Sequence, residues 1–459
     1  MKTNLVKTLA GSLVLMMAFP TFAAGNATVP PSSTLNLSAT KGGNIARLTI
    51  TNAGNQVWVI QSSSNLVQWS EVAAWKVHNG DFRRNLTNNL QPNLFYRAFY
   101  DAGRQTISST TSNALMLPVA PFNYAAPVLP VSFQVNPILA QDNTPANNLT
   151  TDLGAQLGRV LFYDKRLSTN QTVSCSSCHQ QAHGFSDPRR FSVGFDGSIG
   201  TRNSMSLSHA RWYQRRNFFW DERAATLEDQ TLMPIQNPIE MGMTLEALTN
   251  RLAAEPFYTN LFALTFGSPD ITTNRVSRAL AQFVRSIVST ASKYDVGVTN
   301  NFTNFTAQEN LGRQIFLGQV GTPPATCAAC HGTDNFVPGG AINNNGLEFP
   351  FVDRGLGAIT GNPADDGKFK VPSLRNIELT APYMHDGRFT NLEQVVDFYS
   401  TGVVDNPNLS PPMRGPGGGV IRLNLNPGQK AALVAFLKTL TDTNLATNPK
   451  YSDPFNYGD

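Results

Sequence analysis

The 459-residue chain has little cysteine, little charge and few apolar runs. Only four residues are cysteine, and charged residues make up 14% of the chain. The formal net charge is +4, which becomes +2 (4 − 2) if a leader that carries Lys2 and Lys7 is removed. So small a positive excess argues against nucleic acid or an acidic membrane surface as a partner.

Long apolar runs are absent beyond the N-terminus. Residues 1–23 carry two lysines, then an apolar stretch, then Thr21-Phe22-Ala23 as a cleavage site, which is the layout of a secretory signal peptide. That stretch is too short to span a bilayer, and no later run approaches the about 20 residues that a spanning helix needs. No cysteine lies near the cleavage site to carry a lipid anchor. The sequence predicts an exported protein, periplasmic or associated with the cell surface, with no membrane span.

The cysteines all belong to two copies of one motif, each ending in a histidine: Cys175-Ser-Ser-Cys178-His179 and Cys327-Ala-Ala-Cys330-His331. A disulfide framework would leave these histidines unexplained, and zinc would need further ligands near each pair. C-x-x-C-H is instead the attachment signature of c-type haem. The thiols, one helical turn apart, bond one porphyrin, and the adjacent histidine binds its iron. The motifs predict two covalently bound haem c groups.

The residue pattern divides the remaining chain into a β part and a helical part. Short β-branched or aromatic runs at 46–50, 57–61 and 94–99 predict a small all-β, sandwich-like module, and six prolines indicate a stiff linker after it. Helical periodicity begins near Leu153 and predicts helices at Thr244–Ala254, Asn274–Thr290, Ala307–Phe316, Asn391–Tyr399 and Pro427–Leu440. Thr390 with Glu393 predicts a capping box, and Asn426-Pro427 predicts a helix start.

The predicted fold class is mainly α, with two helical haem domains after the all-β module. The two haem motifs lie 152 positions apart (327 − 175), which leaves room for a domain around each, and no repeat of 20 to 50 residues is visible. The expected parts are a signal peptide at 1–23, an accessory module at 24–117, a linker at 118–148, haem domains at 149–300 and 301–445, and a tail at 446–459.

Several further motifs occur in a fixed order around the two haem motifs. They are L-G-R-V-L-F-Y-D from Leu157, G-T-R-N-S from Gly200, F-W-D-E-R from Phe219, N-P-I-E-M from Asn237 and L-R-N-I-E-L-T-A-P-Y from Leu374. From residue 157 to 440 the chain thereby resembles the bacterial di-haem cytochrome c peroxidases and the related enzyme MauG. The resemblance implies two cytochrome c-like domains, an N-terminal haem that reduces peroxide and a C-terminal haem that relays electrons.

The same resemblance implies roles for individual residues. Glu240 matches the distal glutamate that carries protons during O–O cleavage, a task that needs a carboxylate within hydrogen-bond reach of the open iron face. Gln230 falls where the family has a second distal polar residue. Trp220 matches the tryptophan that carries electrons or holes between the haems.

A calcium ion at the boundary between the haem domains is also implied. Asn203, with the backbone carbonyls of Thr380 and Pro382, matches the family's calcium ligands. Oxygen ligands suit such a hard cation. The ion would fix the two haem domains relative to each other.

Two positions depart from the pattern of the classical peroxidases. Phe195 stands where many members carry a histidine that closes the peroxidatic iron at rest, so we expect an iron that is open without reductive activation. Tyr399 stands where classical members place a methionine ligand, as in MauG, where a tyrosine binds this haem. Met413 remains an alternative sixth ligand, and axial ligand identity sets the haem potential. His385 is expected near the haem edge or a domain contact rather than on iron.

Three functions follow. The first is a di-haem peroxidase that reduces hydrogen peroxide to water with electrons from a small redox protein, a cytochrome c or a cupredoxin. The second is a MauG-like oxidase that uses the peroxide-derived oxidised state on a protein or aromatic substrate. The third is a pure electron-transfer cytochrome, which would need two six-coordinate irons, and the sequence offers no good sixth ligand for the first. The sequence leaves a homodimer open.

Overall fold

The computed structural model describes strands between residues 16 and 100 together with Val67, and then residues 114–321, 327–337 and 342–456. The expected signal peptide lies outside the described residues except for Met16–Met17. The chain separates into two compact units, of which the second comprises residues 123–255 and 262–453. The first comprises residues 1–122, 256–261 and 454–459.

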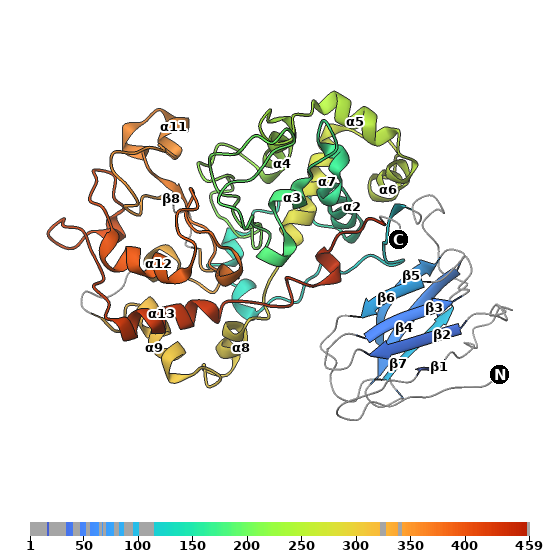
Figure 1. Cartoon of the computed structure of the whole chain (residues 1–459), viewed down its shortest axis with the longest axis horizontal. Coiled ribbons are helices and arrows are strands. Elements are labelled where there is room, and N and C mark those ends of the chain that lie inside the picture. Colours follow the sequence, from blue (N-terminus) through green and yellow to red (C-terminus); the bar gives the residue numbers. More distant parts are fainter. Residues whose placement is uncertain are drawn as a thin grey trace. The chain divides into compact units, whose positions relative to one another are not determined.

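The strands of the first unit form two sheets (Figure 1). A three-stranded antiparallel sheet has the order β2-β3-β6, with β2 at Thr34–Ala39, β3 at Ala46–Thr51 and β6 at Phe82–Leu86. A four-stranded sheet has the order β1-β7-β4-β5, with β1 at Met16–Met17, β7 at Phe95–Tyr100, β4 at Gln56–Ser63 and β5 at Ser70–Val77. The runs predicted as strands from the sequence coincide with β3, β4 and β7.

From residue 152 onward the structure is mainly helical, as predicted. The helices are α2 (Asp152–Tyr163), α3 (Cys175–Cys178), α4 (Leu227–Gln236), α5 (Leu245–Ala253), α6 (Pro256–Phe266), α7 (Thr273–Ser286), α8 (Lys293–Thr299), α9 (Ala307–Phe316), α10 (Cys327–Cys330), α11 (Leu356–Thr360), α12 (Leu392–Asp397) and α13 (Pro427–Lys438). Two short strands, β8 (Ile342–Asn343) and β9 (Phe369–Lys370), pair in an antiparallel two-stranded sheet.

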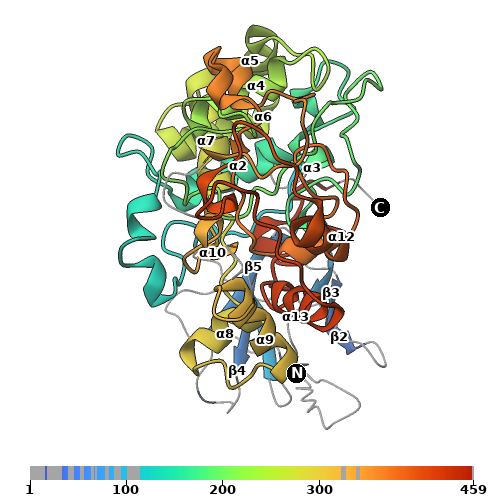
Figure 2. The same cartoon turned by 90° about the vertical axis from the view of Figure 1, so that its left-hand side faces the viewer.

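Two helix pairs form the framework of this region, and both cross at a glycine. In both views α2 lies beside α7 and α9 lies beside α13 (Figure 1, Figure 2). A Cβ on Gly158 of α2 would lie 1.9 Å from the carbonyl oxygen of Ala279 on α7. A Cβ on Gly312 of α9 would lie 1.9 Å from the carbonyl oxygen of Ala432 on α13. Only glycine permits such a close approach of two helix backbones. The two helix pairs are therefore packed in the same way, and each C-x-x-C-H motif follows the first helix of its pair.

The helix boundaries agree with the sequence prediction in part. Helix α9 has the predicted bounds, and Asn426 caps α13 by accepting a hydrogen bond from the Gln429 amide at 2.9 Å. The predicted Thr390–Glu393 capping box is wrong, because Asn391 is the residue that caps α12. Helix α7 ends at Ser286, before the predicted end at 290.

The segments expected as a linker and a tail contribute to the core of the second unit. Phe133 and Ile138, from the expected linker at 118–148, are buried in a cluster with Trp212. Tyr451, from the expected tail at 446–459, is buried and donates its hydroxyl hydrogen to the Ser286 carbonyl at 2.8 Å. Burial of these aromatic side chains ties both segments to the helical region, which a solvated linker or tail would not do.

Candidate active site

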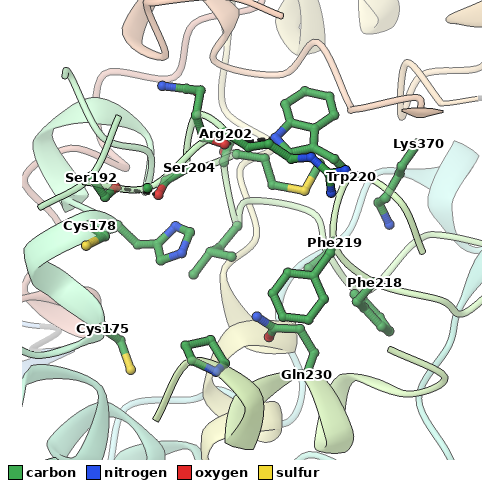
Figure 3. Close-up of a pocket in the computed structure, with 18 of the residues that line it drawn as sticks. Cys175, Cys178, Ser192, Arg202, Ser204, Phe218, Phe219, Trp220, Gln230 and Lys370 are labelled. Atoms are coloured by element: carbon green, nitrogen blue, oxygen red, sulfur yellow. Dashed lines mark hydrogen bonds between the residues drawn. The ribbon is translucent and has the colours of Figure 1, made fainter. Parts of the chain in front are cut away.

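The first C-x-x-C-H motif forms a single helical turn, α3, so the two thiols face the same way. Ser174 and Ser177 form a capping box at its start. The turn ends where the His179 amide donates to the Cys175 carbonyl at 2.9 Å. Neither cysteine is in a disulfide, and both line one wall of a cavity, with Trp220 and Lys370 on its far side (Figure 3).

His179 is oriented for metal binding. Its Nδ1 lies 3.0 Å from the Phe185 carbonyl oxygen, so Nδ1 carries the proton and Nε2 keeps its lone pair. Burial lowers the pKa of His179, which keeps the imidazole neutral. Metal-bound histidines usually donate their other ring nitrogen in this way, because the bond fixes ring orientation and tautomer.

The cavity beside His179 has a volume of about 840 Å³, within the range of cofactor-sized sites. Its lining is largely apolar, and a few polar side chains converge on it. Glu240, Gln230, Trp220 and Arg202 all contribute to the wall. The sequence-predicted distal residues are thus brought to the same cavity as the thiols and His179.

Glu240 is a partly buried carboxyl with a raised pKa. Burial raises its pKa, and the nearby Arg223 together with a hydrogen bond from Asn237 offset only part of that effect. Asn237 Nδ2 donates to Glu240 Oε1 at 2.8 Å. A carboxyl with a raised pKa is a stronger base than an ordinary glutamate, and acid–base catalysis requires a group that can accept and return a proton.

Phe195 is turned away from this cavity. Its ring packs against Gly242, where a Cβ would lie 2.5 Å from ring carbon Cε1. Its backbone amide donates to the Glu240 carbonyl at 2.9 Å, which ties the two loops together. Phe195 is not among the described residues that line the cavity.

The second C-x-x-C-H motif repeats this arrangement on α10. His331 Nδ1 lies 3.1 Å from the Phe336 carbonyl oxygen, and burial lowers the pKa of His331 to about 4. The two thiols and His331 line a second cavity of about 200 Å³.

Both candidate sixth ligands lie at this second cavity. Tyr399 belongs to a π-helical turn, Phe398–Gly402, that continues α12. Its hydroxyl oxygen accepts a hydrogen bond from Asn345 Nδ2 at 3.1 Å, and burial raises its pKa to about 12. Met413 is buried and lines the same cavity.

Trp220 lies between the two cavities, as does Lys370, and both residues line each of them. The Trp220 indole Nε1 donates to the Asn203 carbonyl at 2.8 Å, which fixes the ring. The Lys370 amide donates to the Trp220 carbonyl at 2.8 Å. His385 lines the second cavity and stacks on Phe369, with ring centroids 3.8 Å apart.

The residues predicted to bind calcium lie in two neighbouring segments. The Asn203 amide donates to the His385 carbonyl at 2.7 Å, which joins the Asn203 loop to the segment that carries Thr380 and Pro382. Asn203 is buried, and its Nδ2 donates to the Arg189 and Arg190 carbonyls at 3.1 and 3.3 Å. Across the described part of the chain, no cluster of three or more His, Cys, Asp or Glu side chains could hold a metal ion.

The donor sets at both cavities fit haem c. Each offers two cysteines one helical turn apart and outside any disulfide, a neutral histidine with Nε2 available and a surrounding apolar wall. Residues 153–302 match the family model described as di-haem cytochrome c peroxidase. The cytochrome c551 peroxidase of Nitrosomonas europaea is 34% identical over 337 residues, which cover 72% of this chain and 91% of that protein. The chain belongs to the di-haem cytochrome c peroxidase/MauG family.

Other relatives of this di-haem peroxidase carry the MauG name. The methylamine utilization protein MauG of Methylorubrum extorquens is 36% identical over 308 residues, covering 64% of this chain and 80% of that one. A crystal structure of a MauG-like protein associated with microbial copper homeostasis is 36% identical, with a TM-score of 0.61, covering 70% of this chain and 99% of that one. Members of the family are oxidoreductases that act on peroxide, and two haem c groups are the cofactors that membership implies.

Sequence reasoning missed several polar groups of the di-haem peroxidase site. Lys370 is buried between the cavities, and its ammonium lies 3.1 Å from the centroid of the Tyr213 ring. Arg202 bridges Asp221 at 2.5 Å and Asp353 at 2.7 Å. The spacing of motifs does not predict contacts between positions so far apart in the sequence. The one signal in the sequence for Lys370 was a basic residue between the apolar residues Phe369 and Val371.

Among the described helices, none has the length and apolar character needed to cross a membrane.

Proposed function

We propose that this chain is a di-haem c-type peroxidase that reduces hydrogen peroxide to water with electrons from a small redox protein. The observation that carries the proposal is Glu240, a partly buried carboxyl in the same cavity as His179 and the two cysteines. Haem c held by Cys175, Cys178 and His179 would supply the iron at which peroxide binds and the first electrons for O–O cleavage.

Glu240 moves the protons in this scheme. Reduction of HOOH to two waters requires a proton to leave one oxygen and return to the other. Asn237 holds Oε1, which leaves Oε2 for proton exchange. Gln230, on the same wall, is assigned as a second polar group that orients the peroxide.

The second haem would be held by Cys327, Cys330 and His331 and would receive electrons from the donor, a cytochrome c or a cupredoxin. Trp220 is assigned as the relay because it lines both cavities and its ring is fixed by the hydrogen bond to Asn203. The equivalent helix pairs around the two motifs support separate haem domains at 149–300 and 301–445. Residues 24–117 are assigned to a β-sandwich-like accessory module.

Asn203, Thr380 and Pro382 are proposed as oxygen ligands of a calcium ion that fixes the two haem domains. The protein is proposed to act in the periplasm or at the cell surface, after removal of residues 1–23. Loss of bound calcium from purified protein on Asn203→Ala substitution, measured by elemental analysis, tests the ion site.

A second candidate function is a MauG-like oxidation of a protein substrate. Two observations favour it: Phe195 packs on Gly242 instead of facing the first cavity, and Tyr399 faces the second. An open first iron would react with peroxide without prior reduction. A tyrosine ligand on the second iron would favour its oxidised state.

Ferric optical and EPR spectra of the holoenzyme, followed by peroxide turnover with reduced cytochrome c, test both proposals. A high-spin signal from the first haem with rapid peroxide-dependent oxidation of cytochrome c is expected for the peroxidase. A high-spin signal without cytochrome c turnover would favour the oxidase. A wholly low-spin first haem that ignores peroxide would refute both.

A further inference from the structure

Tyr213 is a buried phenol at the first cavity with a carboxylate beside it. It is 2% exposed and lines the cavity that also contains His179 and Trp220. Its hydroxyl donates a hydrogen bond to Oε1 of Glu222. The Glu222 side chain is 1% exposed.

Arg215 holds Glu222 in place from the solvent side. Its Nε donates to Oε1 at 2.8 Å and to Oε2 at 2.7 Å, and a terminal nitrogen lies 2.6 Å from Oε2. The Arg215 side chain is 38% exposed, so water can solvate its charge when the carboxylate is neutral. Glu222 is therefore an oriented proton acceptor, and the Arg215 cation stays solvated when Glu222 gains a proton.

Lys370 connects Tyr213 to the inter-haem tryptophan. Its Nζ lies 3.1 Å from the Tyr213 ring centroid, while its backbone amide donates to the Trp220 carbonyl. Burial lowers the pKa of Lys370 to about 7, so its charge over the ring is not permanent. A cation on a ring face stabilises the neutral ring and opposes removal of an electron from it.

We propose that Tyr213 is a redox-active relay residue, which gives an electron to the peroxide-oxidised first haem site as its phenolic proton moves to Glu222. This inference rests on the proposed function, because peroxide supplies the oxidising equivalents. The step balances: the O–H bond of Tyr213 breaks, Glu222 Oε1 gains the proton, and one electron leaves to give a neutral tyrosyl radical. An electron from the donor and the same proton restore the phenol.

The chemistry requires the coupled proton transfer. Burial raises the pKa of Tyr213, so the phenol does not ionise before it is oxidised. Oxidation without proton loss would place a cation radical in a buried site, at a cost that scales with desolvation. The hydrogen bond to Glu222 avoids that cost, because the phenolic proton leaves together with the electron and the tyrosyl radical stays neutral.

Rapid freeze-quench EPR of the ferric holoenzyme mixed with hydrogen peroxide tests the proposal. We expect a radical signal whose hyperfine pattern narrows when the protein contains ring-deuterated tyrosine, and that signal should be absent from Tyr213→Phe. Tyr294→Phe is the matched control, because Tyr294 donates to Asp334 Oδ1 at 2.7 Å but lines neither cavity. A signal insensitive to deuterated tyrosine, or one lost in the control and kept in Tyr213→Phe, overturns the assignment.

Two further variants test the proton step and the role of the lysine. Glu222→Gln should slow radical formation by about 100-fold or more, and should abolish the solvent deuterium isotope effect of the parent enzyme. Lys370→Met should increase the radical yield, because it removes a cation from the ring face. Unchanged radical kinetics in Glu222→Gln would overturn the coupled transfer.

Failure of this inference is distinguishable from failure of the proposed function. If peroxide leaves the ferric haem spectrum of the parent protein unchanged, the proposed function fails. If the haem spectrum responds but no tyrosyl signal forms, only the role of Tyr213 fails. Optical spectra of each variant check that both haems are attached.

Discussion

Replacing Glu240 by glutamine should remove the proposed proton carrier while keeping the shape of the first cavity. The amide is nearly isosteric with the carboxyl but cannot accept and return a proton. General acid–base catalysis contributes typically 10²–10⁴-fold. The peroxide kcat/KM should fall by that factor, which at 1.36 kcal/mol per tenfold corresponds to about 3–5 kcal/mol of lost transition-state stabilisation.

The pH dependence provides a second measure of the same residue. Glu240 must be ionised to take a proton from HOOH, and burial raises its pKa above the ordinary glutamate value. Activity is therefore expected to be full above the raised pKa and to fall as pH decreases through it. Glu240→Gln should abolish this inflection and leave a flat profile over the same range.

Stopped-flow mixing of peroxide with the reduced holoenzyme measures both effects. Glu246→Gln is the control, because Glu246 is exposed near the start of α5 and faces neither cavity. It should behave as the parent enzyme. A loss of less than about tenfold in Glu240→Gln, below the acid–base range, or an unchanged acid limb would refute the assignment of Glu240 as the proton carrier.

Three further outcomes are expected. Gly158→Ala should destabilise the protein by about 1–3 kcal/mol, because the new Cβ would meet the α7 backbone. Gly417→Ala is the control: a Cβ there meets nothing within 4 Å, so the thermal unfolding midpoint should stay unchanged. Tyr399→Phe should change the low-spin EPR signal of the second haem while Met413→Leu leaves it unaltered; the opposite pattern would assign the methionine. Burial tends to raise the pKa of Asp295, but its buried arginine partner outweighs burial and lowers it. The stability that Asp295 contributes is thus present above the ordinary aspartate pKa of about 3.9 and lost as pH falls through the lowered value. Asp295→Asn should lose this acid-dependent part in denaturant titrations, and an unchanged pH dependence would contradict the argument.

Much of this protein could be predicted from local sequence. The two C-x-x-C-H motifs predict haem attachment because the thiols and the histidine lie within five consecutive residues. One helical turn is enough to bring side chains at that spacing together. Helix α9 and the cap of α13 were predictable for the same reason, since periodicity and capping depend on neighbours three and four positions away. The Thr390 cap failed because Asn391, one position later, offers the same kind of side-chain acceptor.

The similarity of the two helix pairs has a signal in the sequence, at a spacing far longer than a repeat of 20 to 50 residues. Leu157-Gly158-Arg159 and Leu311-Gly312-Arg313 recur 154 positions apart. Three residues alone would be a coincidence. Their meaning depends on α7 and α13, whose backbones approach the two glycines at the same distance.

The sequence by itself determined the two C-x-x-C-H motifs, and with them the prediction of two haem c groups and of where each would attach. Only the tertiary structure decided which other side chains reach them. Tyr213 and Lys370 are 157 positions apart, and their contact arises from the packing of β9 beside the first cavity. Tertiary packing likewise places Phe195 on Gly242 and brings Trp220 to the wall of both cavities. Covalent attachment follows from spacing along the chain, whereas proton and electron transfer depend on distances through space that the folded core sets.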